Sequence, residues 1–453
     1  MGASIRNFLI AAIVALACGP VTAALADDAT CPGTTLPAPR VAPFIRTIQP
    51  AQGSNAAYDC LMWQTFIYLN WPGKANRRGV PNPKMEFGAP ALAVWESFKT
   101  VDEVFLHSGD DPGPWDASLA NRFADTLRSL VGNGVFHLLK QHSKVSDALK
   151  APENPNSPQH DAKKTLLDDA NQTDGGNLID QNGEAVYYQM LMDKDEYNYI
   201  VLNRLYNANS QSTFARQHGI ELPMGISAYG DLGAIEVKAA WKILGPGDDP
   251  ARFHTAEALI GDPQQPVLVG LVGLHIVQHV APLHQAVWAT FAQIDNAPLA
   301  TEPGTARHYS FFNARCSLKK CPTNTVTDGS KPTQVVQERP VPDDAARVNA
   351  FMQKMIADVA PRAPWQYYQL IDVQWPQAPE QLPKPPQAAP LPTGSPSTTR
   401  LLNPVLETYL QRYNQEISCL SCHQMARTAE STDQPFAADY SFLLSHARGL
   451  KQE

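Results

Sequence analysis

The clearest structural pattern in the chain is Ile235-Glu236-Val237-Lys238-Ala239-Ala240-Trp241-Lys242-Ile243, in which apolar and polar side chains alternate. A period of two predicts a strand with one buried face, here the face of Ile235, Val237 and Trp241. The same alternation turns Glu236 and Lys238 to the opposite face, where we expect them to be solvated.

Neighbouring segments extend this strand into a sheet. Residues 185–192 and 286–293 are further candidate strands, and residues 267–279 are apolar on both faces, as in a central buried strand. Residues 57–71 predict a helix that ends at Pro72. We therefore expect an α+β fold, with a large mixed or antiparallel sheet flanked by helices.

Composition and the N-terminus indicate an exported protein. The 453 residues are 43 % hydrophobic and carry a formal net charge of -8, without the Lys/Arg-rich block expected of a nucleic-acid binder. Residues 1–26 resemble a signal peptide, with Arg6, a short apolar run and the small residues Ala24 and Ala26. We expect a periplasmic protein with no lipid anchor at Cys18 and no transmembrane anchor in the mature chain.

Proline content divides the remaining chain. Residues 376–397 contain eight prolines, which favour an extended linker. We expect an α+β body over 27–375 and a small α-helical module over 398–453, with helices at 401–417 and 438–450.

Six cysteines remain after residues 1–26 are removed. An oxidising compartment favours pairing of thiols. We expect one disulfide between Cys316 and Cys321, five residues apart, and a second between Cys31 and Cys60; sequence alone does not prove this connectivity.

The last two cysteines lie in Cys419-Leu420-Ser421-Cys422-His423, the C-x-x-C-H pattern of covalent haem attachment. Two thiols at this spacing add to the two vinyl groups of haem c, and His423 then ligates the iron from the proximal side. A redox-active C-x-x-C pair would not require His423, and a zinc site would require a second pair of ligands nearby.

Several stretches of the chain resemble one protein family. The resemblance runs from about Cys60 to Leu444 and identifies the exported cytochrome c family proteins of Gram-negative bacteria. It implies haem and a periplasmic location, but no particular reaction. The stretches are Trp63-x-x-Phe66-Ile67-x-Leu69-Asn70-Trp71-Pro72, Val94-Trp95-Glu96, Glu236-Val237-Lys238-Ala239-Ala240-Trp241, residues 270–277, Trp288-x-Thr290-Phe291-x-x-x-Asp295-Asn296, and Glu407-Thr408 with the haem motif.

The distal side of the iron decides the function. The only Met after His423 is Met425, two residues away, so the usual downstream Met ligand is missing. His275, His279 and His446 are the distal candidates, and His275 is also a candidate catalytic acid/base above an open iron.

Three functions remain open at this point. The first is a monohaem c-type cytochrome that transfers electrons to a periplasmic redox partner. The second is a peroxidase- or oxygenase-like haem enzyme with an open distal site roofed by the body. The third is a redox sensor that binds a ligand or partner.

Overall fold

The computed structural model describes residues 31, 56–75, 77–116, 137–138, 177–260, 265–280, 286–303, 307–327, 331–375, 398, 400–412, 417–429 and 435–449. The predicted signal peptide 1–26, which includes Cys18, and the proline-rich linker 376–397 lie outside these residues. Both therefore remain predictions, as do the domain boundaries that depend on them.

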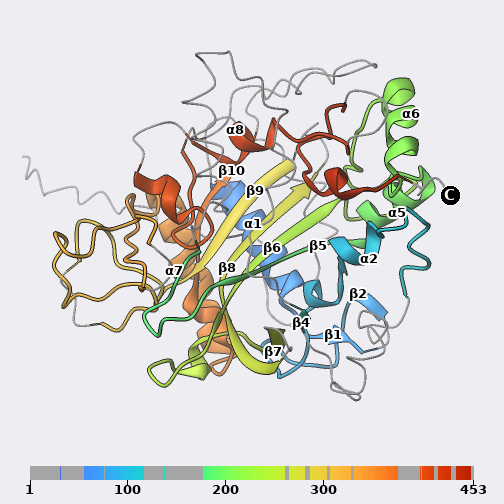
Figure 1. Cartoon of the computed structure of the whole chain (residues 1–453). Helices are drawn as coiled ribbons and strands as arrows, with labels where there is room; N and C mark the ends of the chain where they lie inside the picture. The colour runs from blue at the N-terminus through green and yellow to red at the C-terminus, as the bar shows by residue number, and fades with distance from the viewer. Residues whose placement is uncertain are drawn as a thin grey trace, which may run out of the picture.

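A largely antiparallel sheet forms the centre of the molecule and confirms the α+β prediction (Figure 1). Its main path runs β10-β9-β8-β6-β5-β3, while β7 pairs with β8 and β4 pairs in parallel with β7. A separate pair, β1 and β2, is also antiparallel. The strands are β1 (Gly73–Lys74), β2 (Arg77–Pro81), β3 (Lys99–Thr100), β4 (His137–Leu138), β5 (Tyr187–Met192), β6 (Ile235–Ile243), β7 (Thr255–Ile260), β8 (Gln265–His279), β9 (Ala286–Gln293) and β10 (Tyr368–Gln374).

Helices α1 and α7 cover one face of this sheet. Trp63 of α1 packs edge-on against Phe291 of β9, and its indole Nε1 donates to Asn349 of α7 at 2.8 Å. Burial of these aromatic side chains supplies much of the core, since each removes a large apolar surface from water. The α-helices and 3₁₀ helices are α1 (Ala56–Leu69), η1 (Trp95–Ser97), α2 (Val101–Val104), α5 (Lys194–Leu202), α6 (Ala208–His218), η3 (Pro250–Arg252), α7 (Asp343–Val359), η4 (Pro364–Tyr367), η5 (Thr408–Arg412), α8 (Cys419–His423) and η6 (Leu443–His446).

The C-terminal segment, of which residues 400–412, 417–429 and 435–449 are described, packs on the opposite face. Figure 1 shows α8 above strands β9 and β10. The Asn403 side chain donates to Thr290 Oγ1 of β9 at 2.7 Å, and Leu420 N donates to Gln374 Oε1 of β10 at 2.8 Å. At Gly273 of β8 an added Cβ would lie 2.7 Å from Val405 Cγ2, so glycine permits this close approach.

The prediction of two long helices in the C-terminal segment is wrong. In the described part of 401–417 only η5 is helical, and in 438–449 only η6 is. Asn403 precedes Pro404 and uses its side chain to dock on β9, and a residue before proline avoids helical geometry. Asp439 and Tyr440 have positive φ angles of 47° and 65°, which interrupt a right-handed helix.

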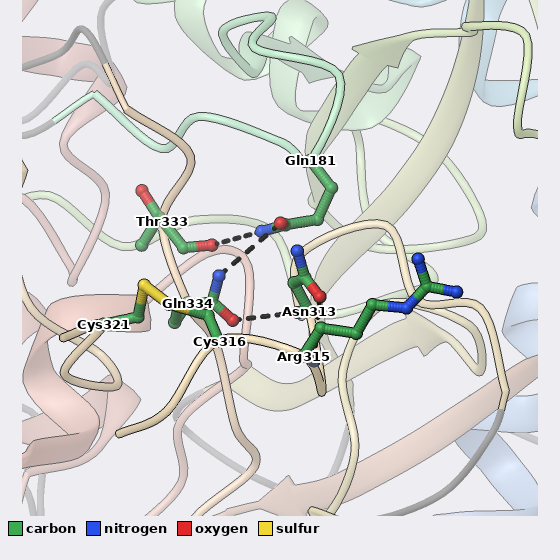
Figure 2. Close-up of a disulfide and its surroundings, with 7 residues drawn as sticks. All are labelled: Gln181, Asn313, Arg315, Cys316, Cys321, Thr333 and Gln334. Carbon is green, nitrogen blue, oxygen red and sulfur yellow. Dashed lines mark hydrogen bonds between the residues drawn. A yellow bond between two sulfur atoms is a disulfide. The ribbon is translucent and has the colours of Figure 1, made fainter. Parts of the chain in front are cut away.

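Both predicted disulfides are confirmed. Cys31 pairs with Cys60 at the start of α1, and Cys316 pairs with Cys321. Figure 2 shows the Cys316–Cys321 loop beside a polar cluster, in which Gln181 donates to the Thr333 carbonyl at 3.0 Å and Asn313 N donates to Gln334 Oε1.

The two disulfides should stabilise the protein unequally. Their sequence separations are 29 and 5 residues, and a cross-link that closes a longer loop removes more entropy from the unfolded chain. Replacing Cys31 and Cys60 by serine should lower the free energy of unfolding by about 3.5 kcal/mol. The matched change at Cys316 and Cys321 should lower it by about 2 kcal/mol. Urea titration of both double variants measures the difference, and an equal or reversed order would contradict the loop-length argument.

Asp59 of α1 makes the folded state sensitive to pH. Its side chain is fully buried, and neither carboxyl oxygen has a hydrogen-bond partner among the described residues. Burial, with repulsion from Asp372 and Asp344, raises the pKa of Asp59 to about 8. Since the ordinary value is 3.8, the folded state holds this proton more tightly, and stability should fall as pH rises between about 4 and 8.

The substitution Asp59→Asn should remove that loss. Relative to wild type, the variant should gain stability on the order of 5 kcal/mol between pH 4 and pH 8. Chemical unfolding of both proteins at several pH values measures the gain. A constant difference across this range would show that Asp59 does not retain its proton.

Candidate functional site

The C-x-x-C-H motif forms the short helix α8. Ser418 caps it reciprocally: its side chain accepts from Ser421 N, and its own N–H donates to Ser421 Oγ at 2.8 Å. The thiols of Cys419 and Cys422 are three residues apart, half-buried and not joined in a disulfide. Helical spacing therefore presents both sulfur atoms on one side.

Both cysteines and His423 line one cavity of about 110 Å³ between the sheet and the C-terminal segment. Most of the wall is apolar, but four ionisable groups from elsewhere in the chain also line it: Glu236, Lys238, His275 and Glu407. The apolar lining includes Leu191, Val237, Val277, Trp288, Leu401, Leu406, Leu410, Ile417, Phe442 and Leu443.

One ring nitrogen of His423, Nδ1, is held by a hydrogen bond, which leaves the other, Nε2, as the candidate ligand. Nδ1 lies 2.8 Å from the Tyr440 carbonyl, to which it donates, and the ring centre lies 4.4 Å from that of Trp288 and 4.8 Å from that of Phe442. Burial lowers the pKa of His423 to about 4, so the imidazole is neutral at pH 7. Nε2 is then the lone-pair nitrogen, and the ring orientation is set by its three neighbours.

Three polar side chains, those of His275, Glu407 and Lys238, form another part of the cavity wall. His275 Nε2 lies 2.8 Å from Glu407 Oε1, and Lys238 is the register partner of His275 on β6. Burial would raise the pKa of Glu407, but His275 and Lys238 outweigh it and hold that pKa below its usual value. Burial lowers the pKa of Lys238. Glu407 is thus a carboxylate that orients the His275 ring.

The expectation of a solvated face for Glu236 and Lys238 is wrong. Strand alternation placed them correctly on the face opposite Val237, but the C-terminal segment covers that face and turns it into a cavity wall. Sequence reasoning also missed the role of Glu407. The alternation of 235–243 carried a signal for the cavity wall, because it places two charged side chains, Glu236 and Lys238, on one face of a strand whose other face is buried.

The other two histidine candidates, His279 and His446, are not among the described residues that line this cavity. His279 lies two strand positions beyond the cavity residue Val277, is 2 % exposed, and its Nδ1 is 3.8 Å from Asp439 Oδ2. Burial lowers the pKa of His279 to about 3. His446 ends η6, close in sequence to the cavity residues Phe442 and Leu443. Of the predicted distal candidates, only His275 shares the cavity with the haem motif.

Comparisons give no relative from which a function could be transferred. No family model matches the chain, and neither a curated protein nor a solved structure was found to be similar to it. In the part of the chain that the structure describes, no group of three or more His, Cys, Asp or Glu side chains could hold a metal ion. No helix among those residues is long and apolar enough to cross a bilayer.

Proposed function

We propose that this protein is a periplasmic monohaem c-type cytochrome that acts in electron transfer or oxidoreduction. One observation carries the proposal: the two thiols and the imidazole of a C-x-x-C-H motif all line the same apolar cavity. Haem is a flat, largely apolar molecule, so the apolar lining of the cavity and its donor set suit it. The two disulfides agree with an oxidising compartment.

Each residue of the site has a role in this proposal. Cys419 and Cys422 would hold haem c through thioether bonds, and His423 Nε2 would ligate its iron; the bound group would supply one-electron chemistry. The Tyr440 carbonyl accepts the Nδ1–H of His423, which selects the tautomer with a free Nε2 and increases its basicity. Trp288 and Phe442 restrict rotation of the ring, and the leucine-rich wall excludes water.

A second candidate function is a haem enzyme with an open distal position. The favouring observation is the His275–Glu407 pair. Histidine usually binds iron through Nε2, and in His275 this nitrogen is engaged by Glu407, which suits a proton donor better than an axial ligand. Such a residue would deliver a proton to a small oxidant such as peroxide.

One set of measurements tests both candidates. Optical spectra of the purified full-length protein, ferric and ferrous, with and without carbon monoxide, report haem, spin state and access to the iron. A covalent haem that survives denaturation supports the c-type cytochrome, and its absence overturns it. Rapid carbon monoxide binding favours the enzyme; a low-spin iron that excludes it favours a closed electron carrier with a periplasmic redox partner.

A further inference from the structure

A carboxyl pair lies in the cavity wall beside the proposed haem. Glu236 of β6 lines the cavity, and its carboxyl group is hydrogen-bonded to that of Glu196 of α5, whose side chain is fully buried. Two carboxylates are both acceptors, so this hydrogen bond requires a proton on one of them. Among the described residues, no N–H or O–H group with a fixed proton donates to either oxygen of Glu196. The pair therefore shares a proton.

The surroundings of Glu196 and Glu236 raise the pKa of both carboxyl groups. Repulsion from acidic neighbours adds to burial at Glu196, and its pKa is raised; burial raises that of Glu236 to about 7. The Ser441 side chain donates to Glu236, which favours the ionised form there. Glu196 is therefore the proton donor in the pair. The titratable groups around the two residues are Asp193 at the N-cap of α5, Asp195 on α5, Asp439 on the C-terminal segment, His279 on β8, Glu221, and the cavity residues Lys238, His275 and Glu407.

Two buried atoms without hydrogen-bond partners in the described structure, on His279 and Asp439, also indicate that this region binds protons. His279 Nδ1 is buried without a hydrogen-bond partner in the described structure, 3.8 Å from Asp439 Oδ2. The Oδ1 atom of Asp439 is likewise buried and unpaired there. An unpaired buried acceptor destabilises the folded state unless a proton or another donor reaches it.

We propose that Glu196 and Glu236 form a proton-binding site in the cavity wall, which takes up one proton from solvent when the haem accepts one electron from a one-electron donor. The inference rests on the proposed function. Before reduction the pair holds one shared proton, and after reduction it holds two. One negative and one positive charge enter together, so the net charge of this low-dielectric region is unchanged.

Potentiometry of the full-length holoprotein at several pH values tests the site. In wild type the midpoint potential should fall by about 59 mV per pH unit across neutral pH, the slope for one proton per electron. Glu236→Gln removes the carboxylate that accepts the second proton, so its potential should change little with pH, whereas Glu196→Gln mimics the protonated Glu196 and should keep most of the slope. Glu257→Gln, an exposed residue of β7 outside the cavity, makes the same charge change and should keep the wild-type slope.

Two further readouts keep the outcomes distinct. A pH-indicator dye should report about one proton taken up per electron in wild type, and almost none in Glu236→Gln. Infrared spectroscopy of the full chain should show the carbonyl band of a buried carboxylic acid that Glu196→Gln removes, whether or not haem is attached. A pH-independent wild-type potential, or a slope retained in Glu236→Gln, overturns the site. A protein without covalent haem contradicts the proposed function, while the infrared band still tests the shared proton.

Discussion

Replacing Cys419 and Cys422 together by serine should abolish covalent haem attachment. Both sulfur atoms lie on one side of α8 and at the wall of the same cavity, so both thioether bonds are lost at once. The denatured variant should be colourless and should have the mass of the polypeptide alone, whereas wild type keeps its colour. Each single variant should retain a haem held by one bond. Mass spectrometry after acid–acetone extraction measures all four proteins.

A matched control separates this effect from a general loss of cysteine. The double variant of Cys316 and Cys321 also removes two sulfur atoms, but from a disulfide loop that does not line the cavity. It should unfold more easily and yet carry the full amount of haem. Equal haem loss in both double variants would indicate failed folding, and colour retained without Cys419 and Cys422 would contradict the proposed attachment.

The sheet could be predicted from sequence because its signals are local. Alternation over 235–243 and a two-sided apolar run at 267–279 each follow from neighbouring residues, and both became strands of the central sheet. The disulfides were predicted from the expected export of the chain, which favours pairing of thiols, and for Cys316 and Cys321 also from their separation of five residues. The haem motif is also local, being contained in five residues of α8.

The cavity could not be predicted, because distant contacts build it. His275 and Glu407 are 132 residues apart, and no periodicity links them. The C-terminal segment follows the sheet surface instead of forming long helices, since Asn403 docks on β9 and Asp439 and Tyr440 have positive φ angles. These tertiary contacts override the helix propensity of the segment. They also convert Glu236 and Lys238 from expected surface residues into cavity residues.

Replacing His275 by glutamine should distinguish a proton donor from an iron ligand. If the bound haem leaves one position of its iron open, the oriented His275–Glu407 pair would supply a proton to a peroxide there, while the haem would supply the redox chemistry; such acid catalysis contributes about 10²–10⁴-fold. His275→Gln should then slow the reaction with hydrogen peroxide by that factor, while carbon monoxide binding to the ferrous protein changes little. Stopped-flow spectroscopy measures both rates on the same holoprotein.

A second His–Glu pair provides the control for this experiment. His254 Nε2 lies 3.1 Å from Glu96 Oε2, and neither residue lines the cavity of the haem motif. His254→Gln removes an imidazole that also lies beside a glutamate but outside this cavity, so the peroxide rate should stay near wild type. If His275 ligates the iron, His275→Gln changes the spectrum from low-spin to high-spin and allows carbon monoxide to bind faster. That result would contradict the acid–base role and assign the protein to closed, bis-histidine electron carriers.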